Sequence, residues 1–119
     1  MKDKYIIEVI LPISVEGTFS YLSNQEIEIG KRVLVQFGKR KLYTGIVFSN
    51  DNKYDSSIKY KSVLEILDEI PVVGTNQLSF WKWISEYYMC SIGSVMRAAI
   101  PNFLKLESDT IVKISKNYD

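Results

Sequence analysis

The chain has 119 residues, 46% of them hydrophobic, and its 15 Lys and Arg residues oppose 14 Asp and Glu residues, which gives a formal net charge of +1. This length predicts one domain with a modest hydrophobic core, and the charge balance excludes a uniformly basic surface or an acidic tail. There is no histidine, one cysteine (Cys90) and no phosphate-binding glycine loop of a common type. These absences argue against histidine- or cysteine-based catalysis, a zinc site and a nucleotide site, and favour a binding module.

The sequence also favours a cytoplasmic location. A single cysteine without a disulfide partner fits a reducing compartment. The apolar run at residues 5–11 is interrupted by Glu8 and followed by no small-residue cleavage site, so we interpret it as a strand and not as a signal peptide. No stretch has the ~18 apolar residues that a membrane-spanning helix needs, so we expect no membrane partner.

The first half of the chain predicts short strands. β-branched and aromatic residues gather in runs separated by Pro, Gly and Asn, namely residues 5–11 (YIIEVIL), 18–22 (TFSYL), 32–37 (RVLVQF) and 42–49 (LYTGIVFS). Alternation in the third run places Val33, Val35 and Phe37 on one face. Gly45, inside the fourth run, indicates a bulge or a close approach of two backbones.

After residue 49 the pattern changes. Residues 50–60 are rich in Asn, Asp and Ser and predict a mobile surface loop. Residues 61–70 fit both a helix and a strand, and we favour the strand partly because of the family resemblance given below. From Thr75, taken as an N-cap, apolar residues recur at helical spacing. Ser91 caps a second helix, which Pro101 ends.

Together these elements predict an α+β fold, with a small antiparallel, barrel-like sheet over residues 1–70 followed by a helical pair over residues 75–100. Residues 105–119 contain one more strand-like run, TIVKIS, without an evident partner. We interpret residues 105–119 as the start of a linker in a longer protein.

One turn is far more basic than the rest of the sequence. Between residues 31 and 50 there is no Asp or Glu but there are five cations, Lys31, Arg32, Lys39, Arg40 and Lys41. Such a patch suits contact with a phosphate backbone. It also suits a solvated turn whose charges protect a sheet edge from aggregation. Charge alone leaves both interpretations open.

Several motifs follow one another in a distinctive order and spacing: GTFSYL (17–22), GKRVLVQFGKRKLYTGIV (30–47), KSVLEILDEIPVV (61–73) and FWKWISEYYMCSIGSVMRAAIP (80–101). In this combination the chain resembles, over roughly residues 5–104, the amino-terminal region of the primosomal protein N′ (PriA) family of replication-restart helicases. The resemblance implies that residues 1–104 form a 3′-end DNA-binding domain, which captures the 3′ end of the nascent leading strand at a stalled fork.

The resemblance also implies partners and cofactors. The partners would be forked DNA with a free 3′ end and the helicase domains of the same chain, and other primosome proteins and single-strand-binding protein are further candidates. The fragment itself would be no enzyme and need no cofactor, because ATP, magnesium and zinc would serve the helicase region that follows. The alternative is a protein-interaction module that docks onto the motor domain or a primosome partner.

By motif position, the family's pocket for the 3′ end maps onto Phe19, Ser20, Tyr21, Gly38 and Lys61. The resemblance implies that Phe19 to Tyr21 frame the terminal base, that Gly38 lets the main chain approach, and that Lys61 meets phosphate or the terminal nucleotide. It also implies contacts to DNA phosphates from Lys39, Arg40 and Lys41.

Ordinary structural roles compete with these assignments. Phe19 and Tyr21 share one face of a strand and Ser20 faces the other, so we expect at least one of the two aromatic residues in the core. The family often has Asp where Ser20 stands. A serine is a neutral donor or acceptor in place of a charged acceptor, so selectivity for the end is weaker here or rests on main-chain groups. Gly38 suits a turn, and Lys61 suits an exposed loop position.

The aromatic residues of the carboxyl-terminal half recur at helical spacing. Such residues usually pack, so we predict that Trp81, Trp83, Tyr87 and Tyr88 lie in the core or between helix and sheet. Cys90 is expected to be a small buried hydrophobic residue.

Overall fold

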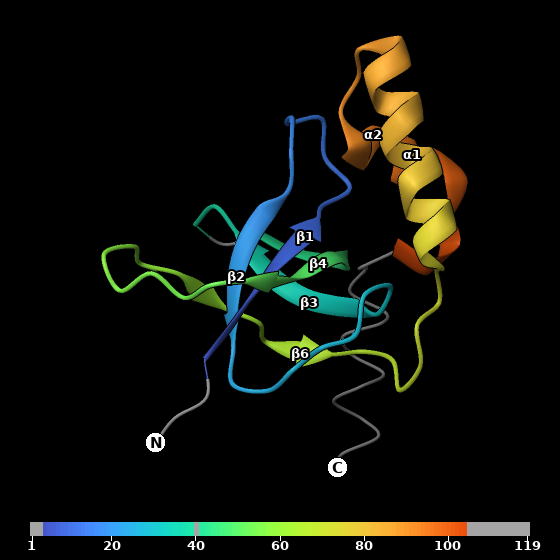
Figure 1. Ribbon diagram of the computed structural model, residues 1–119. Coiled ribbons are helices and arrows are strands. Elements are labelled where there is room, and N and C mark those ends of the chain that lie inside the picture. Colours follow the sequence, from blue (N-terminus) through green and yellow to red (C-terminus); the bar gives the residue numbers. More distant parts are fainter. Residues whose placement is uncertain (1–3, 40, 105–119) are drawn as a thin grey trace.

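In the computed structural model, which describes residues 4–39 and 41–104, a curled six-stranded sheet is followed by two α-helices that stand to one side of it (Figure 1). The strands are β1 (Tyr5–Ile10), β2 (Phe19–Ser23), β3 (Arg32–Phe37), β4 (Lys41–Asn52), β5 (Lys61–Ser62) and β6 (Glu65–Ile66). The helices are α1 (Thr75–Tyr88), α2 (Ile92–Ala99) and a short 3₁₀ helix, η1 (Pro101–Leu104). The predicted α+β fold is confirmed.

The sheet is mixed, whereas the sequence predicted an antiparallel one. Its strand order is β5-β2-β1-β4-β3-β6, and β5 runs parallel to β2 while the other neighbours are antiparallel. The reason is that residues 61–66 cross from one edge of the sheet to the other. The amide of Val63 donates to the carbonyl of Leu22 at 2.9 Å, and the amide of Leu64 donates to that of Leu34 at 2.8 Å. This crossing segment joins the two edges and curls the sheet into a half-barrel.

Side chains at alternate strand positions form the core inside the half-barrel. Val33 and Val35 are fully buried and Phe37 is half-buried, as the alternation of residues 32–37 predicts. They pack with Ile7, Val9, Leu11, Tyr21, Ile27 and Val47. Gly45 confirms the predicted close approach of two backbones, because a Cβ atom there would lie 2.8 Å from the carbonyl oxygen of Ile10.

A second hydrophobic cluster attaches the helices to the outer face of the sheet, and it comprises Ile10, Ile46, Val73, Leu78, Trp81, Ile92 and Met96. Gly93 of α2 sits directly on the main chain that follows β1. A Cβ atom at this glycine would lie 2.0 Å from the carbonyl oxygen of Leu11. The first turn of α2 therefore fits closely against the sheet layer.

Several predicted boundaries need correction. The fourth strand continues to Asn52, so the predicted loop at residues 50–60 begins inside a strand. The N-cap of α1 is Gly74 without a side-chain cap, and Thr75 is the first helical residue. Ser91 caps α2 as predicted, since its hydroxyl accepts from the amide of Ser94 at 3.1 Å. Within residues 61–70 the strand prediction holds only for the two pairs of residues in β5 and β6. The predicted linker at residues 105–119 lies outside the described residues.

Candidate nucleic-acid interface

Lys61 and Gly38, which are 23 positions apart in the sequence, meet at one end of the sheet. Lys61 opens β5, and its ammonium group donates to the carbonyl of Gly38 at 2.8 Å. Gly38 lies in the turn between β3 and β4 with a φ of +77°, a conformation that favours glycine. Both residues are exposed. The contact brings two of the sequence-predicted pocket residues together and ties the basic turn to the start of β5.

Phe19 belongs to the same end of the sheet. It is half-buried, and its ring packs edge-on against that of Phe37 with 4.8 Å between the centroids. Because Phe37 directly precedes Gly38, this contact places the side chain of Phe19 beside the turn. Phe19 is therefore a wall of the candidate site that still exposes part of its ring.

Tyr21 is a core residue. Its side chain is 3% exposed, and its hydroxyl donates to the carbonyl of Gln36 at 2.9 Å. Burial raises the pKa of Tyr21 to about 12, so the hydroxyl stays protonated and keeps its donor. The expectation that at least one of the two β2 aromatic residues is in the core is confirmed. Through its hydrogen bond to Gln36, Tyr21 connects β2 to the end of β3 next to the candidate site.

The side chain of Ser20 faces away from this group, as strand alternation predicts. Its hydroxyl donates to the carboxylate of Glu8 on β1 at 2.6 Å. Thr18 and Asn52 donate to the same carboxylate at 2.8 and 2.6 Å. The hydroxyl of Ser20 is thus committed to a hydrogen-bond cluster on the other face of the sheet.

The main chain of Phe19 and Ser20 is paired on one side only, in contrast to that of the next two residues of β2. On the β1 side these residues pair with Val9 and Glu8, whereas β5 begins to pair with β2 only at Tyr21. The outer backbone edge of β2 is therefore open at residues 19–20 and covered from Tyr21 onward. An open edge presents main-chain hydrogen-bonding groups to a ligand, immediately beside Lys61.

The basic turn is held by a side chain that the sequence did not single out. The amide nitrogen of Gln36 donates to the carbonyl of Lys39 at 2.6 Å and is 3.4 Å from that of Gly38. Lys39 and Lys41 are exposed and have no ion-pair partner in the part of the chain that the structure describes, which does not include Arg40. Lys39 and Lys41 therefore present their ammonium groups to solvent at the two sides of the turn.

The other two cations counted in the basic stretch are neutralised locally. Lys31 lies 3.4 Å from the carboxylate of Glu28, and the guanidinium of Arg32 contacts Asp68 at 2.8 Å. Burial opposes ionisation of Asp68, but its hydrogen bonds from Arg32 and the charge of that residue outweigh burial, so the pKa of the carboxyl lies below its usual value. Among the described cations of residues 31–50, the two without an ion-pair partner, Lys39 and Lys41, therefore flank the turn.

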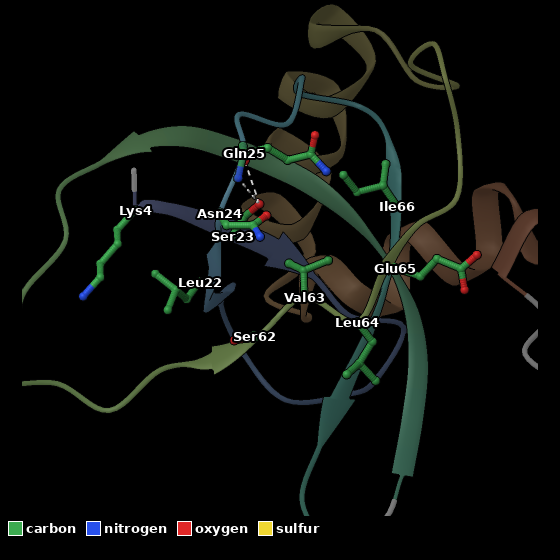
Figure 2. A pocket seen from close by; sticks show the side chains of 10 residues that line it. All are labelled: Lys4, Leu22, Ser23, Asn24, Gln25, Ser62, Val63, Leu64, Glu65 and Ile66. Atoms are coloured by element: carbon green, nitrogen blue, oxygen red, sulfur yellow. Dashed lines mark hydrogen bonds between the residues drawn. The ribbon is translucent and has the colours of Figure 1, made fainter. Parts of the chain in front are cut away.

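A cavity of about 440 Å³ adjoins the site along β5. Leu22 and Ser62 line it, and they directly follow Tyr21 and Lys61 in their strands. Figure 2 shows Lys4 on one side of this cavity and Glu65 on the other, with Leu22 and Val63 between them. The remaining lining residues are Ser23, Asn24, Gln25, Leu64 and Ile66. The cavity therefore lies directly beside the contact between Lys61 and Gly38.

The aromatic residues of α1 divide between two faces. Trp81 is 2% exposed, which confirms its predicted place in the core, but Trp83, Tyr87 and Tyr88 are 55%, 66% and 67% exposed. Core packing was the wrong prediction for these three. The buried residues of α1 are Leu78, Trp81 and Ser85. Cys90 is only half-buried.

Metal and membrane features can be stated for the described residues only. Within residues 4–39 and 41–104, no three Cys, Asp or Glu side chains gather where they could hold a metal ion. None of the described helices combines the length and apolar character that crossing a membrane requires.

Residues 8–101 match the family model for the PriA 3′DNA-binding domain (3′BD). The chain belongs to this family. The matched span covers β2 to β6, both α-helices and every residue of the candidate site described above. The resemblance found in the motifs is therefore confirmed, and the family is that of a DNA-binding module of a replication restart protein.

Full-length relatives of the family share this region. The chain is 32% identical to the replication restart protein PriA of Buchnera aphidicola from Acyrthosiphon pisum, over 91% of this chain and 15% of the relative. It is 31% identical to the PriA protein of Rickettsia prowazekii over 81% of this chain and 15% of the relative. The PriA protein of Haemophilus influenzae is 29% identical over 95% of this chain, which spans 16% of that relative. The chain thus corresponds to a small part of each.

Proposed function

We propose that this domain binds the 3′ end of a DNA strand and, within a replication-restart protein, captures the 3′ end of the nascent leading strand at a stalled fork. The observation that carries the proposal is the contact of Lys61 with Gly38. It puts a cation at the start of β5 next to a turn with free lysines and next to the open backbone edge at residues 19–20. The lysines can contact phosphate and the open main-chain edge can contact sugar or base, so together they can hold one nucleotide.

A strand end differs from an internal nucleotide in its free 3′-hydroxyl and in lacking a following phosphate. Main-chain groups at the open edge can hydrogen-bond sugar or base whatever the sequence. The edge is covered from Tyr21 onward by β5, so a following nucleotide would collide with protein. Because the hydroxyl of Ser20 is bound to Glu8, selectivity here rests on main-chain groups and on this blocked edge.

Charge supplies the second part of the mechanism. The ammonium group of Lys61 can leave the carbonyl of Gly38 for a phosphate oxygen, which is a stronger, charge-assisted acceptor. Lys39 and Lys41 extend the contact along the backbone of the strand, where phosphate contacts position the ligand without reading its sequence.

The test is fluorescence anisotropy with two oligonucleotides of one sequence, ending in a 3′-hydroxyl or a 3′-phosphate. We expect tighter binding of the hydroxyl end, and an affinity that falls with salt by roughly 0.7 log units per log unit of salt for each phosphate contacted. Equal affinity for the two ends would contradict end recognition, even if the binding depends on salt.

We assign no catalytic step to these residues and no cofactor to this domain. In a protein of the relatives' length, ATP, magnesium and zinc would serve the much larger remainder of the chain. A cytoplasmic location, where bacterial DNA is replicated, follows from the same proposal.

A second candidate function is protein docking, and the outer face of α1 favours it. Phe80, Trp83 and Tyr87 are exposed and their rings are nearly parallel, with centroids 6.2 and 5.2 Å apart. The nearby Lys82 is paired with Glu86 at 2.8 Å, so this face has little to attract phosphate. Exposed aromatic residues are typical anchors of protein interfaces.

The partner we propose for this face is the helicase region of a full-length family protein. Calorimetric titration of this domain with that region should show binding that Trp83→Ala weakens at least about tenfold, since aromatic anchors commonly contribute 2 kcal/mol or more. Oligonucleotide affinity should not change. No association of the wild-type domain would contradict the proposal, and binding of another primosome protein or of single-strand-binding protein instead would reassign the face.

A further inference from the structure

The loop that leads into β5 carries an aromatic pair beside a lysine. The rings of Tyr54 and Tyr60 lie with centroids 5.8 Å apart at an interplanar angle of 40°. The ammonium group of Lys4 lies 4.5 Å from the centroid of the Tyr54 ring. Tyr54 is 39% exposed, and Tyr60 directly precedes Lys61. We call Lys4, Lys53, Tyr54, Lys59 and Tyr60 the loop surface.

The loop surface is positively charged. Lys53 and Lys59 are exposed and have no ion-pair partner among the residues that the structure describes. Its acidic neighbours are Asp51 and Asp55, which accept hydrogen bonds from Ser49 and Ser57. Three lysines thus oppose two carboxylates, and Lys61 next to the loop adds a fourth cation. A surface with this charge favours an anionic ligand over an apolar one.

The loop surface is continuous with the candidate 3′-end site. Lys4, which contacts Tyr54, also lines the cavity beside β5 together with Leu22 and Ser62 (Figure 2). Ser62 follows Lys61, whose ammonium group contacts Gly38. Figure 1 shows the loop before β5 and the turn between β3 and β4 projecting from the same side of the sheet. A ligand seated at Lys61 can therefore extend over the cavity to the tyrosines.

We propose that the loop surface binds the nucleotides that precede the 3′ terminus, in single-stranded form. Bases stack on Tyr54 and Tyr60, and phosphates pair with Lys4, Lys53 and Lys59. Stacking on aromatic rings tolerates every base, as binding of an arbitrary strand end requires. Bases of a duplex are already stacked on each other, so the tyrosines select a strand that is unpaired near its end. This proposal rests on the proposed function, because it takes the terminal nucleotide to lie at Lys61.

The first test is a length series of 3′-hydroxyl oligonucleotides, one dinucleotide and one decanucleotide, measured in competition against a labelled strand. We expect Tyr54→Ala to weaken the decanucleotide about five- to tenfold, the loss of about one stacked base, and to leave the dinucleotide unchanged. Tyr88→Ala is the matched control, since Tyr88 is an exposed tyrosine on α1 that belongs neither to the loop surface nor to the docking face of Phe80, Trp83 and Tyr87. It should change neither affinity.

A second variant keeps the test independent of folding. Lys59→Gln removes a charge from an exposed position, and it should lower the salt slope for the decanucleotide by roughly 0.7 while leaving the slope for the dinucleotide unchanged. If Tyr54→Ala lowers the unfolding temperature but no affinity, and Lys59→Gln leaves the slope unchanged, the loop residues only pack and the proposal is wrong.

The outcomes separate this inference from the proposed function. A wild-type domain that prefers the 3′-hydroxyl but binds the decanucleotide no more tightly than the dinucleotide overturns the loop surface alone. A domain that binds longer strands more tightly through Tyr54, without preferring either chemical end, supports the loop surface as a single-strand site and overturns end recognition.

Discussion

Replacing Lys61 by alanine tests the candidate site most directly. In the free domain its ammonium group makes one exposed hydrogen bond, 2.8 Å long, to the carbonyl of Gly38. The loss of this solvated contact should lower the free energy of unfolding by only about 0.5 kcal/mol. In the complex the same group would face the terminal nucleotide, where a hydrogen bond to a charged group is worth about 1.5–3 kcal/mol. Affinity for a 3′-hydroxyl strand should therefore fall about tenfold or more.

The discriminating measurement is the ratio of affinities for 3′-hydroxyl and 3′-phosphate strands, obtained by anisotropy over a range of salt concentrations. A strand with a blocked end does not reach Lys61, so Lys61→Ala should weaken it little and the ratio should collapse toward one. Lys39→Ala is the control, because Lys39 lies on the rim of the site. It should weaken both strands alike and lower both salt slopes by roughly 0.7. Equal weakening of both strands by Lys61→Ala would refute the assignment of Lys61 to the terminal pocket.

Three further predictions concern the framework of the site. Tyr21→Phe removes the donor to the carbonyl of Gln36 and should lower the free energy of unfolding, measured with urea, by about 1 kcal/mol. The hydroxyl of Tyr43 has no hydrogen bond among the described residues, so Tyr43→Phe should lower it little. The pKa of Asp68 is lowered in the folded state. Its ionised carboxylate therefore contributes to the free energy of unfolding above the unfolded pKa of about 3.9, and this contribution is lost as the pH falls through the folded pKa. In a plot of unfolding temperature against pH, the acid side should be flatter for Asp68→Asn than for wild type. Gly93→Ala would place a methyl group 2.0 Å from a carbonyl oxygen and should lower the free energy of unfolding by about 2 kcal/mol or more, whereas Gly74→Ala, with nothing within 4 Å, should be tolerated; a cost as small as that of the control would contradict the close fit of α2 on the sheet.

Strand alternation made much of the sheet predictable. Val33 and Val35 point inward because residues two apart on a strand share a face. The crossing segment was not predictable in the same way. Each of its strands has two residues, which is too short for any periodicity to develop. Its partners at Leu22 and Leu34 lie far away in the sequence, so its parallel pairing depends on the closed sheet.

The candidate site was predicted in part. Motif order placed Lys61 and Gly38 in one site, and the structure brings them into contact, while the role of these residues in DNA binding stays a prediction. Counting charges along the chain overstated the basic patch, since Arg32 is paired with Asp68, which is 36 positions away. The open edge at residues 19–20 had no signal in the sequence, because it depends on where β5 begins.

The helix α1 shows a different limit. Its aromatic residues spread over nearly half of the helix circumference, so spacing alone does not tell which of them will pack. Leu78 and Trp81 are the ones buried against the sheet, which leaves Trp83 and Tyr87 on the outside. The neighbouring helix α2 lies directly against the main chain at Leu11 and Ile13, where Gly93 leaves no room for a side chain.

The crossing segment of residues 61–66 connects the two edge strands of the half-barrel and also carries Lys61 of the candidate site. With only two paired residues at each edge, it holds the two margins of the sheet together by fewer hydrogen bonds than any longer strand does. If the hydrogen bonds of this segment to β2 and β3 were lost, β5 would no longer cover the end of β2, and Lys61 would no longer lie beside the turn. The proposed site for a strand terminus would therefore exist only while β5 and β6 stay paired, so binding of a terminus would stabilise this pairing and the pairing would favour binding.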